Sequence, residues 1–217
     1  MGSITRSFAN NITTSGVLLP ASLVNNSIAN VTSYNAAIAT GNMVLISTQT
    51  ASNSASISFT TGIDSTYKEY QFWFVDIHPR TATAYFQFNL STDSGSNYNV
   101  TKTSTHFDAY HSEDNVHADL TYEVSFDLAQ STSFQTMVRD LGNGADESCA
   151  GSLQLFNPSS TTYVKHYISN LSGYHGFPLE LNAYCAGYGN TTSAINAVQF
   201  KMSSGNFDGT ILLYGIV

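Results

Sequence analysis

The sequence predicts an all-β protein, a jelly-roll-like β-sandwich preceded by an extended N-terminal arm. Short apolar or alternating runs recur along the chain, and turns rich in Gly, Asn, Ser and Pro separate them. The clearest runs close the chain: residues 194–202 alternate apolar and polar side chains, and residues 210–217 are apolar almost throughout. A nearly continuous apolar run predicts a buried strand. Such a strand must pair with an already folded sheet, which favours a closed or two-layered β body.

Four further strands are expected in the first half of the chain. They lie at residues 43–47, 55–60, 69–77 and 84–90. The third is the clearest core strand, because it carries the only tryptophan between apolar neighbours. We expect the fourth to pair with it across a connection that contains Pro79. Residues 99–130 are less regular, and a helix at residues 122–128 stays open although strong helix formers are scarce.

A hairpin is expected in the second half of the chain. Residues 152–156 and 162–169 are strand-like, and Pro158 presets a turn dihedral between them. Gly187 and Gly189 are interpreted as part of a tight turn before the next strand. No internal repeat is visible, which disfavours propellers and β-solenoids.

Few residues of this chain carry a charge. Charged side chains make up 10% of the sequence, against roughly 25% in an average soluble domain, while hydrophobic residues reach 42% with 13 Tyr and 13 Phe. The net charge of −8 comes from 15 acidic and 7 basic residues, and the basic residues form no cluster. This distribution argues against nucleic acid and anionic membranes as partners, since both require clustered Lys and Arg. No stretch reaches the roughly 18 apolar residues of a membrane-spanning helix.

Residues 1–50 differ from the rest of the chain. Arg6 is their only charged residue, and their short apolar patches are spaced by Asn, Ser and Thr. Such patches cannot build a core, so we expect an extended arm with a short strand near its end, ordered against its own domain or a neighbouring subunit. Residues 51–217 are expected to form the sandwich. The candidate partner-binding residues are the apolar side chains of the arm: Ile4, Phe8, Ile12, Val17, Leu18, Leu19, Leu23 and Val24.

The cysteines and histidines give little evidence of chemistry. Cys149 and Cys185 could form a disulfide, but residues 1–6 show no start of a secretory signal, which favours two free or buried thiols. Three histidines and three acids could hold a divalent ion only if a polar loop folded back on itself. Their spacing matches no metal motif, so we expect solvated loop residues and predict no metal and no cofactor. These residues are His106, His111, His117, Glu113, Asp114 and Asp119.

Catalytic patterns are equally weak. The sequence contains no Gly-x-Ser-x-Gly elbow. A glycoside hydrolase would need two acids that converge across a cleft. The candidates are Asp76, Asp108, Glu113, Asp114, Asp119 and Glu123. These acids are dispersed, and only Asp76 lies in a core-like run, so the sequence predicts a protein that is not an enzyme. A polysaccharide depolymerase or esterase is the least favoured interpretation.

Three parts of the chain carry a resemblance to a known family. They are SISFTTGIDSTYKEYQF at residues 56–72, LFNPSSTTYVKHY at residues 155–167, and the closing runs at residues 192–206 and 209–216. Together they resemble virion structural proteins of aquatic tailed bacteriophages, cyanophages among them. The resemblance extends over about residues 45–217 and supplies no catalytic residues. It implies a virion protein that is assembled in the host cytoplasm and exposed on the particle surface.

The resemblance and the composition together favour a capsid decoration or cement protein. Such a protein binds the major capsid protein or another virion protein and stabilises the head. We expect a homo-oligomer, a trimer or a dimer, because closed oligomers fit the symmetric positions of a capsid lattice. The alternative is a tail fibre or receptor-binding protein that recognises a host surface glycan through exposed aromatic residues in a groove.

Overall fold

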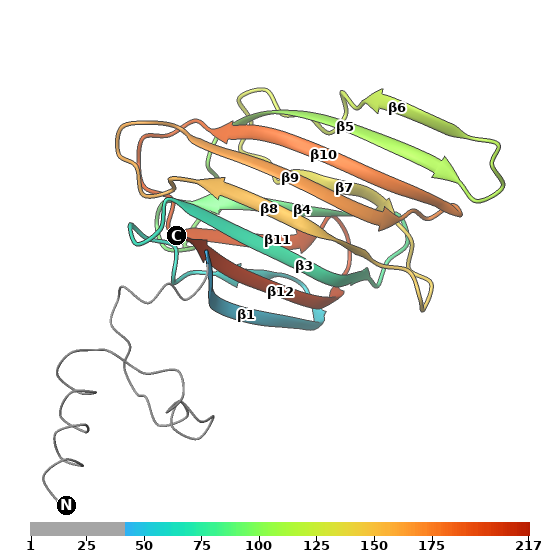
Figure 1. Cartoon of the computed structure of the whole chain (residues 1–217), viewed down its shortest axis with the longest axis horizontal. Coiled ribbons are helices and arrows are strands. Elements are labelled where there is room, and N and C mark those ends of the chain that lie inside the picture. Colours follow the sequence, from blue (N-terminus) through green and yellow to red (C-terminus); the bar gives the residue numbers. More distant parts are fainter. Residues whose placement is uncertain (1–41) are drawn as a thin grey trace, which may run out of the picture. The chain divides into compact units, whose positions relative to one another are not determined.

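Two antiparallel β-sheets pack face to face in the computed structural model, which describes residues 42–217 (Figure 1). The larger sheet has eight strands and the smaller sheet has four. All regular structure in this part of the chain is β, so the predicted all-β sandwich is confirmed. Its twelve strands exceed the eight of a simple jelly roll. None of the described residues forms a helix suited in length and apolarity to spanning a membrane.

The order of the strands in space differs from their order in the chain. Across the larger sheet the strands are β1 (Met43–Ser54), β12 (Phe207–Ile216), β3 (Glu69–Pro79), β8 (Cys149–Phe156), β9 (Lys165–Tyr174), β10 (Leu179–Gly189), β5 (Lys102–Ser112) and β6 (Ala118–Tyr122). Across the smaller sheet they are β2 (Ile57–Phe59), β11 (Ala197–Met202), β4 (Ala84–Ser91) and β7 (Gln135–Leu141). In Figure 1, β1 and β6 form the two edges of the larger sheet.

Most of the predicted strands are present. β8 and β9 form the expected antiparallel hairpin, with Pro158 in the turn between them. β1 pairs with β12 from Met43 onward, so the sandwich begins before residue 51 and the expected boundary after residue 50 falls inside a strand. The arm expected before this strand lies outside the described residues.

The expected pairing of β3 with β4 is wrong. β3 lies between β12 and β8 in the larger sheet, whereas β4 lies between β11 and β7 in the smaller one. The two strands instead meet face to face, with the rings of Phe74 and Phe86 in edge contact at 5.1 Å between centroids. Pro79 ends β3, and the chain then crosses from one sheet to the other. The sequence pattern could not distinguish neighbours within a sheet from neighbours across the core, because both bury one face of each strand.

Four strands were missing from the prediction: β5, β6, β7 and β10. Tyr122 ends β6, residues 124–126 form a turn, and no helix is present at residues 122–128. Gly187 and Gly189 lie within β10, so their assignment to a tight turn is wrong. A Cβ on Gly187 would lie 2.5 Å from the Thr103 carbonyl oxygen and 2.6 Å from the Tyr167 hydroxyl. Glycine is therefore required there for close packing, and its low strand propensity hid the strand.

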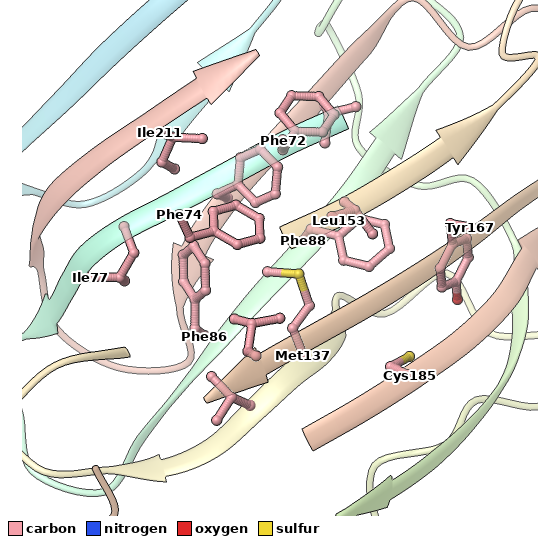
Figure 2. Close-up of a cluster of buried hydrophobic side chains, with 14 of the residues drawn as sticks. Phe72, Phe74, Ile77, Phe86, Phe88, Met137, Leu153, Tyr167, Cys185 and Ile211 are labelled. Carbon is pink, nitrogen blue, oxygen red and sulfur yellow. The ribbon is translucent and has the colours of Figure 1, made fainter. Parts of the chain in front are cut away.

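Phenylalanine rings from both sheets form the centre of the core (Figure 2). Phe200 of β11 contacts the rings of four other phenylalanines, with centroids between 5.0 Å and 6.2 Å away. These partners are Phe59, Phe72, Phe74 and Phe86, and all of them are buried. Three of the four contacts have edge-to-face geometry, which aromatic quadrupoles favour.

Two buried lysines lie at one end of the larger sheet. Lys102 of β5 and Lys165 of β9 both pair in register with Gly189 of β10, and neither side chain is exposed. The Lys102 ammonium donates hydrogen bonds to Asn89 Oδ1 at 2.5 Å and to the Val100 carbonyl oxygen at 2.9 Å. Burial lowers the pKa of Lys102 to about 7. Its contribution to stability therefore depends on pH within the neutral range.

The Phe200→Ala substitution should remove about 3 to 5 kcal/mol of unfolding free energy, because it leaves a cavity among four rings that cannot collapse onto it. Phe177→Ala is the matched control, since Phe177 is 68% exposed and its loss should cost less than about 1 kcal/mol. Urea unfolding followed by tryptophan fluorescence measures both. Similar losses in the two variants would contradict the central role of Phe200.

Lys102 should make the protein more stable as the pH rises above 7. The unfolded chain keeps the Lys102 proton up to its ordinary pKa of 10.5, whereas the folded chain releases it near 7. The unfolded state therefore binds more protons in this window, and the unfolding free energy rises with pH. Between pH 7 and pH 9 the unfolding free energy should rise by about 2 kcal/mol. The range ends at pH 9 because this is the ordinary pKa of a thiol, at which the two buried cysteines ionise in the unfolded chain.

The Lys102→Met substitution should remove most of this rise, with any remainder due to Lys165, whose pKa burial also lowers. Lys68→Met should retain the rise because Lys68 is exposed and Lys102 remains in place. Urea midpoints at several pH values between these limits provide the measurement. If the urea midpoint of the Lys102→Met variant rises with pH as steeply as that of the wild type, the folded state buries no titrating ammonium at this position.

Candidate functional site

The unequal widths of the two sheets create the candidate site. β7, at one edge of the smaller sheet, packs against β9 and β10 of the larger sheet. The smaller sheet therefore does not extend over β5 and β6. Residues 123–134 cover part of this overhang, where the Glu123 and Leu128 backbones hydrogen-bond to those of His106 and Ser104 at 2.9 Å. The part that remains uncovered is a pocket of about 800 Å³.

Four segments supply the walls of the pocket. They are the end of β5, the β5–β6 turn with β6 and the residue after it, one position on β7, and the β9–β10 turn. The lining residues are Tyr110, Ser112, Glu113, Asp114, His117, Thr121, Glu123, Arg139, His175, Phe177, Pro178 and Leu179. A volume of this size with both aromatic and polar walls is typical of small-molecule sites.

Arg139 is held in the wall by carboxylates. Its Nε donates a hydrogen bond to Asp108 Oδ2 at 2.7 Å, and its Nη1 donates to Asp140 Oδ2 at 3.0 Å. Glu123 Oε1 lies 3.7 Å from Nη2 on the pocket side. Burial by itself favours the neutral guanidine, but the hydrogen bond and the charge of Asp108 outweigh it and raise the pKa of Arg139. Asp108 is fully buried, so Arg139 compensates a carboxylate that water does not reach.

His175 enters the pocket from the β9–β10 turn. The turn is tied to the end of β7, where Leu141 bridges to His175 and the Gly176 amide donates to the Asp140 carbonyl oxygen at 2.7 Å. The Phe177 amide donates to His175 Nδ1 at 3.0 Å. Burial lowers the pKa of His175. The imidazole is therefore neutral at pH 7 with its proton on Nε2, because Nδ1 acts as an acceptor.

The pocket has an excess of negative charge. Glu113, Asp114 and Glu123 line it, while Arg139 is already paired with Asp108 and Asp140 behind the wall. Asp114 Oδ1 accepts hydrogen bonds from the Ser112 hydroxyl at 2.6 Å and from the Val116 amide at 3.0 Å, and these bonds lower its pKa. The lining therefore offers carboxylate oxygens as acceptors and disfavours an anionic ligand.

A second exposed feature lies on the outer face of the larger sheet. One residue from each strand aligns in register across all eight strands: Thr48, Leu212, Trp73, Ser152, Asn170, Tyr184, Phe107 and Tyr122. We call this set the aromatic row. Its four aromatic side chains are 39% to 48% exposed. The rings of Tyr184 and Phe107 stack in parallel at 5.2 Å.

The histidines predicted as one loop cluster are separated in the structure. His106 is fully buried on β5, and neither ring nitrogen has a hydrogen-bond partner among the described residues. His111 is exposed near the end of the same strand, with Nε2 3.1 Å from Asn115 Oδ1, and His117 lines the pocket. The prediction of solvated loop residues is thus wrong for His106, and His111 is exposed as expected but lies in a strand instead of a loop. Within residues 42–217, no three His, Cys, Asp or Glu side chains are close enough to hold a metal ion.

The acids dispersed in the sequence come together at this site. Asp108 and Glu123 lie on either side of the Arg139 guanidinium, and Glu113 and Asp114 line the same pocket. The other two candidate acids lie elsewhere. Asp76 is exposed at a β-bulge with φ of 51°, which corrects its placement in a core-like run, and Asp119 is exposed on β6.

The remaining sequence predictions have mixed outcomes. Cys149 and Cys185 are both buried and unpaired, as expected. The candidate partner-binding residues all lie outside the described residues: Ile4, Phe8, Ile12, Val17, Leu18, Leu19, Leu23 and Val24. Sequence reasoning missed Arg139 and His175, two nitrogen donors in the pocket lining. The signal for Arg139 was its place directly after the apolar pair Met137 and Val138 in a strand, where a charge requires a partner.

Comparison with known proteins gives no relative for this chain. No family model, no curated protein and no solved structure matches it.

The Arg139→Met substitution should destabilise the protein by about 3 to 5 kcal/mol, because it leaves the Asp108 carboxylate buried without a counter-charge. Arg80→Met is the control, since Arg80 pairs with Asp208 at the surface with 49% of its side chain exposed. Its loss should cost less than about 1 kcal/mol. Urea unfolding measures both.

Combining Arg139→Met with Asp108→Leu should recover much of the loss, since removing both partners of a buried pair is milder than removing one. If the double variant is less stable than Arg139→Met alone, the cost lies in packing and not in the unpaired charge.

Proposed function

We propose that this chain is a non-enzymatic structural protein of a bacteriophage virion. The narrower proposal is a capsid decoration or cement protein that binds the lattice of the major capsid protein and stabilises the head. The observation that carries it is the outer face of the larger sheet, which is exposed, uncharged and aromatic. The resemblance of residues 45–217 to phage virion proteins supports the same assignment.

The outer face has the dimensions of a protein interface. Eight strands at about 4.8 Å spacing give a width of nearly 40 Å, and strands of this length give a face on the order of 1,000 Å². A standard interface buries about 800 Å² on each partner. Exposed apolar side chains continue on both sides of the aromatic row, with Leu45 and Ile168 on one side and Val75 and Leu120 on the other. Exposed apolar side chains spread over three neighbouring rows are typical of an interaction surface.

The chemistry of this face favours a protein lattice over a charged partner. The aromatic row and the row on each side of it contain no Asp, Glu, Lys or Arg. The amides and hydroxyls between the rings, such as Asn170, Ser152 and Gln154, suit hydrogen bonds to backbone and side-chain groups. Interface cores are depleted in charge and enriched in aromatic residues in the same way. An uncharged contact also holds at the varying salt concentrations that a free particle meets.

The N-terminal arm completes the proposal. A segment with one charge and several short apolar patches can gain order on a neighbouring subunit and cover a large surface. A trimer or dimer on a symmetric lattice position would place equivalent arms on equivalent sites.

A second candidate is a tail fibre or receptor-binding protein that recognises a host surface glycan. The pocket beneath the sheet overhang favours it, because aromatic and polar side chains line it together.

Binding to purified capsids that lack this protein tests the leading proposal. A Trp73→Glu, Tyr184→Glu variant places two charges on the aromatic row and should reduce capsid occupancy at least tenfold. Tyr163→Glu is the matched control, because Tyr163 is 70% exposed in the β8–β9 turn and away from the row. Removal of residues 1–40 tests the arm separately and should also lower occupancy. Equal occupancy of all variants and the wild type, or no binding to capsids at all, would refute the decoration role.

Stabilisation of the head is the second expected outcome. A ligand that binds only the assembled state raises its thermal stability by mass action. Capsids saturated with the wild-type protein should therefore release their contents at a higher temperature than bare capsids, and capsids mixed with the double glutamate variant should not.

A further inference from the structure

The pocket contains hydrogen-bonding groups that no described residue satisfies. His175 carries its proton on Nε2, and Asp140 Oδ2 lies 3.7 Å from that atom, which is too far for a hydrogen bond. Only 8% of this side chain is exposed, and it lines the pocket. The Nε2 atom is not among the fully buried atoms that lack a partner, so it is accessible to small molecules. Nε2–H can therefore donate a hydrogen bond to an acceptor supplied from inside the pocket.

The pocket lining also offers an acceptor without a donor. The Glu123 carboxylate accepts no hydrogen bond from any residue between 42 and 217, although it lies 3.7 Å from Arg139 Nη2. The Glu113 carboxylate, by contrast, already has a hydrogen-bond partner in the Tyr174 hydroxyl. Carboxylates accept strong hydrogen bonds from hydroxyl groups. A ligand that fits this lining presents a hydroxyl donor to Glu123 and an oxygen acceptor to His175.

Aromatic rings supply an apolar wall between these polar groups. Phe177 is 68% exposed and stacks on the His175 ring, with centroids 5.6 Å apart and an angle of 22° between the planes. Tyr110 lies in the floor, packed against the core. The C–H faces of a sugar ring pack on aromatic rings, while its hydroxyls act both as donors and as acceptors.

The charges of the lining select among ligand classes. An anionic ligand would meet three carboxylates and a guanidinium that is already paired. A cationic side chain would be attracted to the carboxylates but would leave His175 Nε2–H without an acceptor. A neutral, hydroxyl-rich ligand satisfies both Glu123 and His175.

We propose that the pocket formed by Tyr110, Glu113, Glu123, His175 and Phe177 binds a neutral saccharide. The site stands apart from the outer face of the sheet, so a decoration protein seated on its aromatic row could still present this pocket to sugars of the host surface. The inference concerns the isolated protein and does not depend on where in the virion the chain is placed.

Saturation-transfer NMR on the full chain tests the proposal with defined probes. The neutral probes are the trisaccharides of glucose, mannose, galactose and N-acetylglucosamine, the anionic probe is sialyllactose, and the cationic probe is Nα-acetyl-lysine amide. At least one neutral trisaccharide should give saturation transfer to its ring C–H protons, and the charged probes should not. Transfer to the charged probes alone, or to none of the probes, would overturn the proposal.

Two variants place the sugar in the pocket. Phe177→Ala removes the exposed ring, and Glu123→Ala removes an unpaired acceptor; each should weaken binding of the neutral trisaccharide at least tenfold. Tyr163→Ala and Trp73→Ala remove exposed aromatic rings outside the pocket and should leave the affinity unchanged. Undiminished binding by both pocket variants would refute this site. Loss of binding in the Trp73 variant instead would assign the sugar to the aromatic row. Neither result alters the capsid-occupancy test, so the two proposals fail separately.

Discussion

The contact between the two sheets through phenylalanine rings is the interaction on which the rest of the structure depends. Phe200 of β11 contacts Phe59 and Phe86 of the smaller sheet and Phe72 and Phe74 of the larger one. Each sheet buries one face against the other, so neither is stable in water without the other. Because few residues are charged, apolar burial must supply most of the stability, and it is concentrated where the two sheets overlap.

The smaller sheet covers only part of the larger one, and this mismatch explains the polar half of the interior. On β5 the inward-facing residues are Lys102, Ser104, His106 and Asp108, which follow one another at every second position. Residues 123–134 cover part of this strand in place of another strand. The polar atoms of the inward-facing side chains find partners in backbone groups, in Asn89 of β4 and in Arg139, except for His106. The pocket is the remainder of the same overhang. The buried polar side chains of β5 and the polar lining of the pocket therefore have the same origin, which is the unequal number of strands in the two sheets.

The two faces of the larger sheet present different chemistry at its β5–β6 end. The outer face carries Phe107 and Tyr122 in an uncharged row, whereas the inner face opens on the carboxylates of Glu113 and Glu123. The uncharged row and the polar pocket are separated because successive side chains along β5 point to opposite faces of the sheet. One strand can thus serve a flat protein contact and a concave polar site without conflict between them. The two proposed binding roles occupy opposite sides of a single layer.

Local pattern in the sequence determined the fold class and most of the strands. Alternation at residues 194–202 and the apolar closing run identified β11 and β12, and Pro158 located the β8–β9 turn, because these signals act within a few residues. The partner of each strand was decided only by the tertiary structure, as the separation of β3 from β4 shows. β10 stayed hidden because Gly187 is required by a neighbour distant in sequence. The pocket was hidden for the same reason. Asp108, Glu123, Arg139 and His175 come from four separate segments, and only the tertiary structure, including the packing of β7 against the β9–β10 turn, brings these side chains together.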